Sequence, residues 1–266
     1  MTDIDTVKEA GQEKSAAPAL TKGFSILELV ASEPGLGFAA IRSRLGLPNS
    51  SCHHLISTLC QLGALQLRSD RGYILGLRLL ELGTMAAGQR QIDHHALPFL
   101  RTLAQETQLT CHLGVLEGHA AIYLMKVEGQ REIRVNTWVG KRLSLHSSSL
   151  GKVLLASLPE PELEEMLRHI EWRAKCPNTL TDPERFRAHL REVRHRGWAL
   201  DNEEDLLNIR CVAAPVNDAQ GKVVAAISAV GTVLDISPER LDALAGQVCA
   251  TAQDISHELG YPERGK

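Results

Sequence analysis

The sequence predicts an α+β protein of two domains, an N-terminal winged helix-turn-helix and a C-terminal domain built on an antiparallel sheet. Residues 38–62 contain two helical runs on either side of Gly46, Leu47 and Pro48, which is the layout of a helix-turn-helix. From Thr110 onward, short strand-like segments are joined by turn sequences, with helical runs inserted between them. A chain of 266 residues is long enough for about two domains.

The second helical run in residues 38–62 has two faces of different polarity. Apolar side chains recur at the spacing i, i+3, i+4, i+7, in Cys52, Leu55, Ile56 and Leu59. This spacing predicts that one face is buried. The opposite face carries short or flat hydrogen-bonding side chains, namely Ser50, His54, Ser57 and Gln61. On this stretch alone, an ordinary helical hairpin inside a core is the alternative interpretation.

The turn between the two helical runs has residues that suit a helix-turn-helix. Gly46 can take the left-handed conformation that ends a helix. Pro48 fits the start of the next helix, and Asn49 or Ser50 is a candidate N-cap for it.

A small hairpin is predicted directly after the second helix. Residues 64–75 alternate in polarity around the turn sequence at residues 69–72. One side of this hairpin carries Leu65, Leu67, Tyr73 and Leu75. Three helices closed by a hairpin make a winged helix-turn-helix, so DNA binding becomes the leading hypothesis.

The N-terminal end supplies the remaining helix of this domain. Residues 1–17 are polar and alanine-rich without an apolar period, so we expect a disordered tail. Residues 21–31 predict the first helix, with Phe24, Leu27 and Val30 on one side.

The C-terminal part mixes helices and strands. Residues 77–108 predict two helices with a break near residues 91–95. The first helix is a candidate linker and dimer contact, unless both helices merely pack on their own domain. Strands are predicted at residues 111–117, 120–126, 133–137, 210–216 and 222–230. Further helices are predicted at residues 153–158, 161–170, 183–196 and 241–259.

Charge and composition favour a cytoplasmic regulator over an exported or membrane protein. The net charge is −3, yet residues 18–90 carry seven basic and four acidic residues, which suits a DNA contact confined to one end. No stretch approaches the ~20 apolar residues of a membrane span, and the N-terminus has no signal-peptide pattern. The six cysteines include no CxxC pair and are most simply reduced thiols.

These elements supply the side chains that we expect to contact double-stranded DNA. Those expected to face the major groove are Ser50, Ser51, His54 and Ser57. Those expected to contact phosphates, two before the turn and two on the wing, are Arg42, Arg44, Arg68 and Arg71. Asn49, at the start of the second helix, completes the predicted DNA-binding set.

Several sequence blocks resemble the IclR family of bacterial transcription regulators. Besides the helix-turn-helix with its wing, the blocks are HLGVLEGHAAIYLMKVEG, LHSSSLGKVLLASL, RGWALDNEEDLLNIRCVAAPV and AAISAVG. They occur in the family's order and spacing, and the resemblance covers about residues 18–260.

The resemblance implies the domain organisation and the partners. It implies a winged-helix domain at residues 18–76, a linker helix used in dimerisation at residues 77–91, and an effector domain of GAF- or profilin-like fold at residues 92–262. Members of the family bind operators as dimers or tetramers. A small metabolite changes their DNA affinity or their recruitment of RNA polymerase. Neither catalytic residues nor a cofactor is expected.

The resemblance also implies which residues line the effector site. Carried over residue by residue, they are Ser149, Leu150, Asp201, Cys211 and Ser228. Backbone N–H groups at the start of the helix around Gly151 could hold a carboxylate. Trp138 lies before this loop and could stack on a flat ligand, with core packing as its alternative role. The expected effector is an organic or aromatic acid.

The sequence departs from the family at two sites. Relatives often have Gly-Ala in place of Ser149 and Leu150, and a serine in place of Val230, so small keto acids such as pyruvate or glyoxylate are less expected here. Many relatives carry arginine in place of His54. Histidine reaches less far toward guanine than arginine does. The operator sequence therefore does not transfer from relatives.

Other functional interpretations find less support. Residues 201–205 contain four acids, but acids in a row do not converge on one ion, so we expect a solvated loop with one inward carboxylate. Cys52 and His54 fall on opposite helix faces, which argues against zinc. The serines after His146 lack a GxSxG elbow, and Gly151-Lys152 lacks a phosphate-loop glycine. The remaining alternative is a small-molecule-binding or hydrolytic enzyme with an N-terminal helical interaction module.

Overall fold

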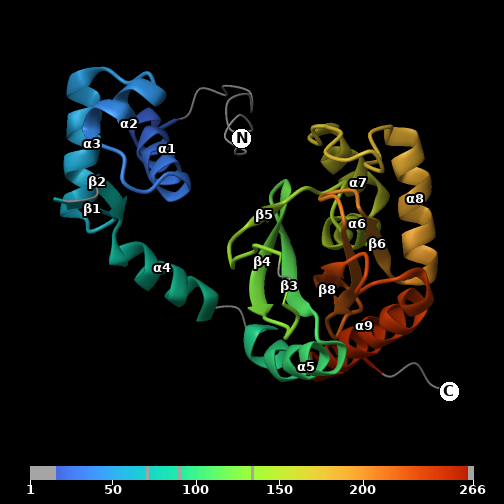
Figure 1. The fold of residues 1–266 in the computed structure, drawn as a ribbon. Coiled ribbons are helices and arrows are strands. Elements are labelled where there is room, and N and C mark those ends of the chain that lie inside the picture. The colour runs from blue at the N-terminus through green and yellow to red at the C-terminus, as the bar shows by residue number, and fades with distance from the viewer. Residues whose placement is uncertain (1–15, 70–71, 89–91, 133–134, 263–266) are drawn as a thin grey trace. The chain divides into compact units, whose positions relative to one another are not determined.

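The chain is an α+β protein of two compact units, as predicted (Figure 1). The computed structural model describes residues 16–69, 72–88, 92–132 and 135–262. The units comprise residues 1–89 and residues 90–266. The predicted disordered tail, residues 1–17, lies almost wholly outside the described residues.

The N-terminal unit consists of helices closed by a two-stranded hairpin. Its elements are α1 (Pro18–Ser32), α2 (Phe38–Arg44), α3 (Asn49–Gln61), β1 (Leu65–Arg68), β2 (Gly72–Leu75) and α4 (Leu77–Gly88). The strands are antiparallel, and the register pairs Leu65 with Leu75 and Leu67 with Tyr73. These four side chains therefore share one side of the hairpin, and the predicted winged helix-turn-helix is confirmed.

The turn between α2 and α3 follows the predicted chemistry in part. Gly46 has a φ of +60°, the left-handed conformation that ends a helix. Pro48 is the N-cap of α3, with extended backbone and no side-chain capping bond. Asn49 is already helical, so the prediction of Asn49 or Ser50 as the cap was wrong.

A small apolar core joins the three helices and the hairpin. Ile26, Ile41 and Cys52 are fully buried at its centre. Phe24 does not join them, because its side chain is 58% exposed. The predicted helix is confirmed, but its buried face includes Ile26, Leu27 and Val30 and leaves Phe24 outside the core.

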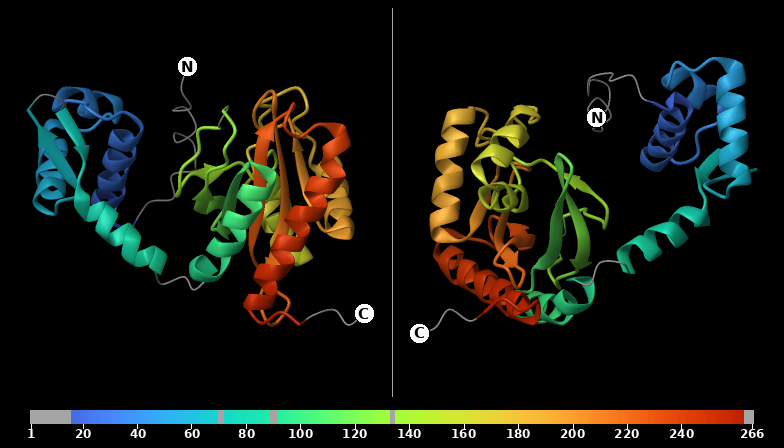
Figure 2. Two further views of the ribbon diagram at one scale, coloured as in Figure 1. Left: turned by 60° about the horizontal axis from the view of Figure 1, so that its bottom comes forward. Right: turned by 180° about the vertical axis from the view of Figure 1, so that it is seen from behind.

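The C-terminal unit is one antiparallel sheet with helices on both faces (Figure 2). Its helices are α5 (Ile92–Thr107), α6 (Ser149–Ala156), α7 (Glu160–Arg168), α8 (Pro183–Arg196) and α9 (Pro238–Glu258). Its strands are β3 (Thr110–Glu117), β4 (Ala120–Val127), β5 (Arg142–Leu143), β6 (Ala199–Asn202), β7 (Ile209–Asn217) and β8 (Val223–Thr232). The strand order is β5-β4-β3-β8-β7-β6.

Alternation along the strands builds a separate apolar core on each face. Leu113 and Ile227 pack with α5 and α9 on one face. Tyr123 and Ala213 pack with α6, α7 and α8 on the other. Strand residues alternate between faces, so neighbouring positions such as Val212 and Ala213 enter different cores.

The edges of the sheet differ from the prediction. Residues 135–137, the described part of a predicted strand at 133–137, form no strand. The place beside β4 is taken instead by β5, where Leu143 pairs with Ala121. The sequence also did not indicate β6, an edge strand of only four residues. Likewise, α5 begins at Ile92, so most of the predicted break at residues 91–95 is helical.

Candidate functional site

The outer face of α3 is polar and open to solvent. Asn49, Ser50 and His54 are exposed, while Ser51 and Ser57 are half-buried. His53, which was not predicted to contact DNA, is also exposed, and its ring centroid lies 6.1 Å from that of His54. In helix-turn-helix proteins, the second helix of the motif enters the major groove. These side chains therefore form a candidate surface for contact with bases.

Arginines flank this surface. Arg42 is exposed in the last turn of α2, and Arg68 is exposed on β1. Arg44 forms an ion pair with Glu33, so a phosphate would have to compete with that carboxylate. Arg71 lies outside the described residues. Arg42 and Arg68 are thus the candidate phosphate contacts whose side chains carry no ion pair among the described residues.

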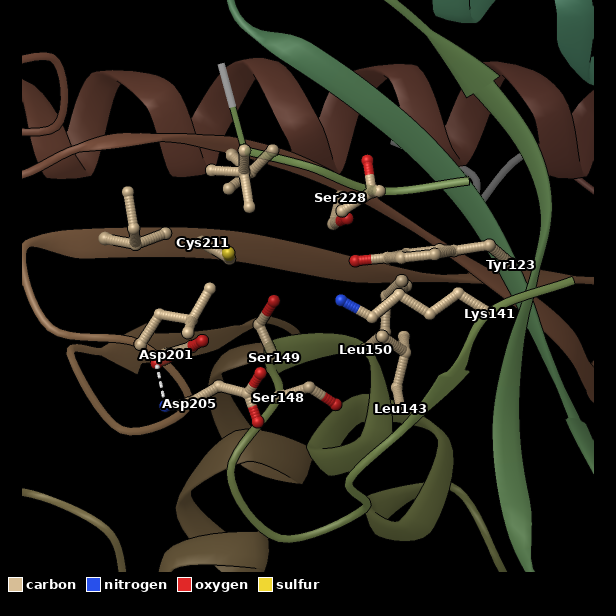
Figure 3. A pocket seen from close by; sticks show the side chains of 15 residues that line it. Tyr123, Lys141, Leu143, Ser148, Ser149, Leu150, Asp201, Asp205, Cys211 and Ser228 are labelled. Atoms are coloured by element: carbon tan, nitrogen blue, oxygen red, sulfur yellow. Dashed lines mark hydrogen bonds between the residues drawn. The ribbon is translucent and has the colours of Figure 1, made fainter. Parts of the chain in front are cut away.

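A cavity in the C-terminal unit lies between the sheet and the start of α6 (Figure 3). The volume of the cavity is about 30 Å³. Its polar lining residues are Tyr123, Thr137, Lys141, Ser148, Ser149, Asp201, Asp205, Cys211 and Ser228. Apolar side chains such as Leu143, Leu150 and Val230 complete the wall.

The structure brings five of the six residues predicted for the effector site to this cavity. They are Ser149, Leu150, Asp201, Cys211 and Ser228. Trp138 is not among the lining residues. Its side chain is 55% exposed, with Lys141 Nζ 5.1 Å from the ring centroid. The alternative role in core packing was therefore wrong, while stacking of Trp138 on a flat ligand stays a prediction.

Helix α6 begins at the cavity because of two local features. Ser148 Oγ accepts a hydrogen bond from the Gly151 N–H at 3.1 Å, which caps the helix. A Cβ on Gly151 would lie 2.6 Å from Leu145 Cα, so only glycine allows this close approach. The first-turn N–H groups point out of the helix N-terminus, where Ser149 and Leu150 line the cavity.

Asp201 is a buried carboxyl group in the cavity wall. Its Oδ1 accepts hydrogen bonds from the N–H groups of Glu204, at 2.8 Å, and Asp205, at 3.3 Å. Burial nevertheless dominates and raises the pKa of Asp201 to about 7. Burial also raises the pKa of the neighbouring Cys211 thiol well above its usual value. Asp201 is therefore only partly ionised at neutral pH, and the Cys211 thiol is uncharged.

Glu204 points away from the cavity and pairs with a buried lysine. Lys152 Nζ donates to Glu204 Oε1 at 2.5 Å and to the Leu200 carbonyl at 2.9 Å. The side chains of Lys152 and Glu204 are 0% and 7% exposed. This ion pair connects α6 to the segment that runs from Asp201, on β6, to Asp205, in the loop after it.

Asp205 is a second carboxylate at the cavity. Its Oδ1 accepts from Ser147 Oγ at 2.5 Å and from Lys175 Nζ at 2.7 Å. These donors outweigh burial and lower the pKa of Asp205, so it is ionised at neutral pH. The prediction of a solvated loop with one inward carboxylate at residues 201–205 was therefore wrong. Asp201, Glu204 and Asp205 all turn inward.

Further lining residues were not predicted from the sequence, notably Tyr123, Thr137, Lys141 and Asp205. Tyr123 shares the inner face of β4 with Ala121, and strand alternation could have indicated this. Behind Tyr123, the His112 ring stacks at 4.1 Å, and its Nε2 hydrogen-bonds Thr137 Oγ1 at 2.8 Å. Burial lowers the pKa of His112 to about 3, so the imidazole that stacks on Tyr123 is uncharged at neutral pH.

The described residues contain no group of three or more histidine, cysteine, aspartate or glutamate side chains placed to hold a metal ion. Cys52 is buried and His54 exposed, which leaves no shared zinc position. Within the described part of the chain, no helix combines the length and the apolarity needed to cross a membrane.

Comparison with known proteins agrees with both units. Residues 19–69 match the IclR helix-turn-helix domain, and residues 84–257 match the bacterial transcriptional regulator IclR C-terminal domain. The HTH-type transcriptional regulator RhmR of Escherichia coli K12 is 39% identical over 249 residues, covering 94% of this chain and 96% of its own.

Solved structures share the fold. The Thermotoga maritima IclR structure has a TM-score of 0.75 at 31% identity, covering 92% of this chain and 99% of its own. An IclR homologue from Microbacterium hydrocarbonoxydans, complexed with 4-hydroxybenzoate, has a TM-score of 0.77 at 27% identity, covering 91% and 98%. The matched families and relatives are transcriptional regulators and not enzymes. This chain belongs to the IclR family of bacterial transcriptional regulators, with an N-terminal helix-turn-helix DNA-binding domain and a C-terminal effector-binding domain.

Proposed function

We propose that this regulator binds operator DNA as a homo-oligomer, and that a small carboxylic acid in the C-terminal cavity controls its DNA binding or its recruitment of RNA polymerase. The observation that carries the DNA-binding part is the exposed polar face of α3 flanked by Arg42 and Arg68. Operator DNA is chromosomal, so the site of action is the cytoplasm.

The proposed base contacts are Asn49, Ser50, Ser51, His54 and Ser57, and the proposed phosphate contacts are Arg42, Arg44, Arg68 and Arg71. Base contacts specify the sequence, whereas phosphate contacts contribute affinity without sequence preference. The two groups therefore predict different effects of mutation.

The test is selection of a binding site from random double-stranded DNA with the full-length protein, followed by competition assays on variants. We expect His54→Ala to change base preference, with His195→Ala, on the exposed face of α8, as the matched control. We expect Arg68→Ala to weaken binding to all DNA sequences alike. It should also reduce the slope of log affinity against log salt concentration by about 1. Arg185→Ala, also exposed on α8, is the control for charge. An unchanged preference in His54→Ala would refute the assignment of the recognition face.

Exposed apolar side chains support α4 as a dimer contact. Those on α4 are Leu77, Leu80, Leu82 and Met85, and each is at least 47% exposed. Sedimentation of the Leu80→Glu variant tests this role. A lower oligomeric state than that of the wild type is the expected result, and an unchanged state would exclude Leu80 from the interface.

The effector part rests on the chemistry of the cavity wall. The N-terminus of α6 and the Lys141 ammonium group both favour an anion. The proposed effector contacts are Ser149, Leu150, Asp201, Cys211 and Ser228, joined by Lys141. The related structure in complex with 4-hydroxybenzoate supports the carboxylic-acid class.

The size of the cavity predicts that binding needs movement of the wall. A cavity of about 30 Å³ holds water but no organic acid, because ligand pockets have volumes of roughly 300–1,000 Å³. Leu206 lines the cavity and is 45% exposed, so its side chain can move into solvent.

A thermal-shift screen with carboxylic acids tests the effector role. A ligand at 100 times its Kd stabilises the protein by about 2.7 kcal/mol. Ser228→Ala should weaken binding, and Ser157→Ala, at the far end of α6, should not. A ligand that stabilises Ser228→Ala as much as the wild type would show that the effector binds elsewhere.

A further inference from the structure

The cavity wall carries an unusual balance of charge for a site that receives an anion. Among the described residues, the lining includes one cation, Lys141, and two carboxyl groups, Asp201 and Asp205. Figure 3 shows the Lys141 nitrogen and the Tyr123 hydroxyl directed toward the middle of the cavity from one side. Ser149 and Asp205 approach from the other. A ligand with a carboxylate alone would pair with Lys141 but would bring no donors to the oxygen atoms of Asp201 and Asp205.

The geometry points to a polyhydroxylated carboxylic acid as the effector, with its carboxylate at Lys141 and its hydroxyl groups donating to Asp205 and Asp201. This inference rests on the proposed effector role of the cavity. It narrows the expected class from organic acids in general to those with hydroxyl groups along the carbon chain.

Asp205 is prepared to accept hydrogen bonds from a ligand. Its Oδ1 is held by Ser147 and Lys175, whereas Oδ2 has no hydrogen bond to any described residue. An ionised carboxylate only accepts hydrogen bonds, so the group that satisfies Oδ2 must be a donor. Hydroxyl groups supply that donor without adding charge, and bonds to an ionised acceptor are the stronger kind.

Asp201 extends the acidic side of the cavity. Its Oδ1 is fixed by two backbone N–H groups, which orient the carboxyl toward the cavity wall. Ser149 and Ser228 add hydroxyls that both donate and accept. A ligand with several hydroxyl groups can satisfy all of these side chains, while a ligand with only an alkyl chain would leave them unpaired.

The aromatic alternative has less support from the wall. Tyr123 is the only aromatic side chain that lines the cavity among the described residues, and the His112 ring already covers one of its faces at 4.1 Å. Trp138 does not line the cavity. A flat ring would therefore find no pair of aromatic faces here. The apolar part of the wall can cover the C–H groups of a hydroxylated chain as well as those of a ring. It consists of side chains such as Leu143, Leu150 and Val230.

The test compares ligands of equal charge on the full-length protein, by calorimetry near pH 7.5. The hydroxylated probes are threonate, xylonate, gluconate and galactonate. Hexanoate is the control, since it matches gluconate in carbon number and charge but has no hydroxyl groups. Pyruvate and 4-hydroxybenzoate represent the competing classes. We expect at least one hydroxylated acid to bind, and hexanoate to bind at least tenfold more weakly.

Three variants locate the ligand. Asp205→Asn, which can still accept from Ser147 and Lys175, should weaken the hydroxylated acid about tenfold or more and should not weaken hexanoate. Lys141→Met should weaken every carboxylate. Glu203→Gln removes one charge from the same loop but does not line the cavity, so it should change neither.

The outcomes separate this inference from the proposed function. Binding of pyruvate or 4-hydroxybenzoate without any hydroxylated acid would overturn the inference and leave the effector role standing. Binding of a hydroxylated acid with full affinity in Asp205→Asn would also overturn it. If no acid binds to the folded protein, both the inference and the effector role fail, while operator binding remains testable by itself.

Discussion

Asp201 is expected to make stability depend on pH. Its pKa is raised to about 7 by burial, whereas in the unfolded chain it titrates near 4. Between these values the folded protein binds the proton and the unfolded chain has lost it, so stability falls as pH rises. The group is 2% exposed, and the full effect is roughly 4 kcal/mol.

Comparison of wild type and Asp201→Asn checks this. Asparagine remains neutral, so we expect the wild type to lose roughly 2–3 kcal/mol relative to the variant between about pH 5 and pH 8. The measurement is urea unfolding at several pH values. Parallel stability curves for the two proteins would mean that Asp201 titrates normally.

Removal of only one partner of the Lys152–Glu204 ion pair is expected to lower the free energy of unfolding strongly. Lys152→Met leaves the Glu204 carboxylate buried without its partner, and such changes destabilise by roughly 3–5 kcal/mol. The double variant Lys152→Met with Glu204→Gln removes both charges, so we expect it to recover much of that loss. Urea unfolding of both variants measures the difference. A double variant no more stable than Lys152→Met would contradict the role of the unpaired charge.

At the scale of elements, two helical glycines should respond oppositely to alanine. A Cβ at Gly151 in α6 would lie 2.6 Å from the Leu145 backbone, so Gly151→Ala must push α6 outward at a cost of about 1–3 kcal/mol. A Cβ at Gly246 in α9 meets nothing within 4 Å. Gly246→Ala should therefore stabilise by about 0.5–1 kcal/mol.

Thermal unfolding checks the pair, with Gly246→Ala as the control for helix propensity. Because α6 begins at the cavity, Gly151→Ala should also weaken the effector, whereas Gly246→Ala should not. Equal shifts in Tm of the same sign would show that contact with Leu145 does not control the position of α6.

At the scale of the whole molecule, the two compact units are expected to unfold separately. Each has its own apolar core, one around Ile41 and Cys52 and the others around the large sheet. We expect two calorimetric transitions, of which only the one belonging to residues 90–266 rises when an effector is added. Calorimetry of residues 1–89 alone would show which transition belongs to the N-terminal unit. A single transition shifted as a whole would show that the units unfold together.

The sequence by itself determined the elements whose signals are local. The segment containing Gly46 and Pro48 indicated the helix-turn-helix, and residues 183–196 indicated α8, because both signals depend on a few neighbouring residues. Resemblance to the IclR family extended this to five cavity residues. Their burial could not be derived from spacing, since they come from α6, β6, β7 and β8.

Only the tertiary structure decided which side chains meet. Trp138 lies outside the cavity because the loop before β5 turns it toward solvent, and no local pattern indicates that. Lys141, Tyr123 and Asp205 meet at the cavity although they are distant in sequence. The sequence of residues 201–205 is typical of a solvated acidic loop. In the folded chain, Lys152 pairs with Glu204 and Lys175 pairs with Asp205. A carboxylate is buried only when its partners are supplied, and here those partners come from other parts of the chain.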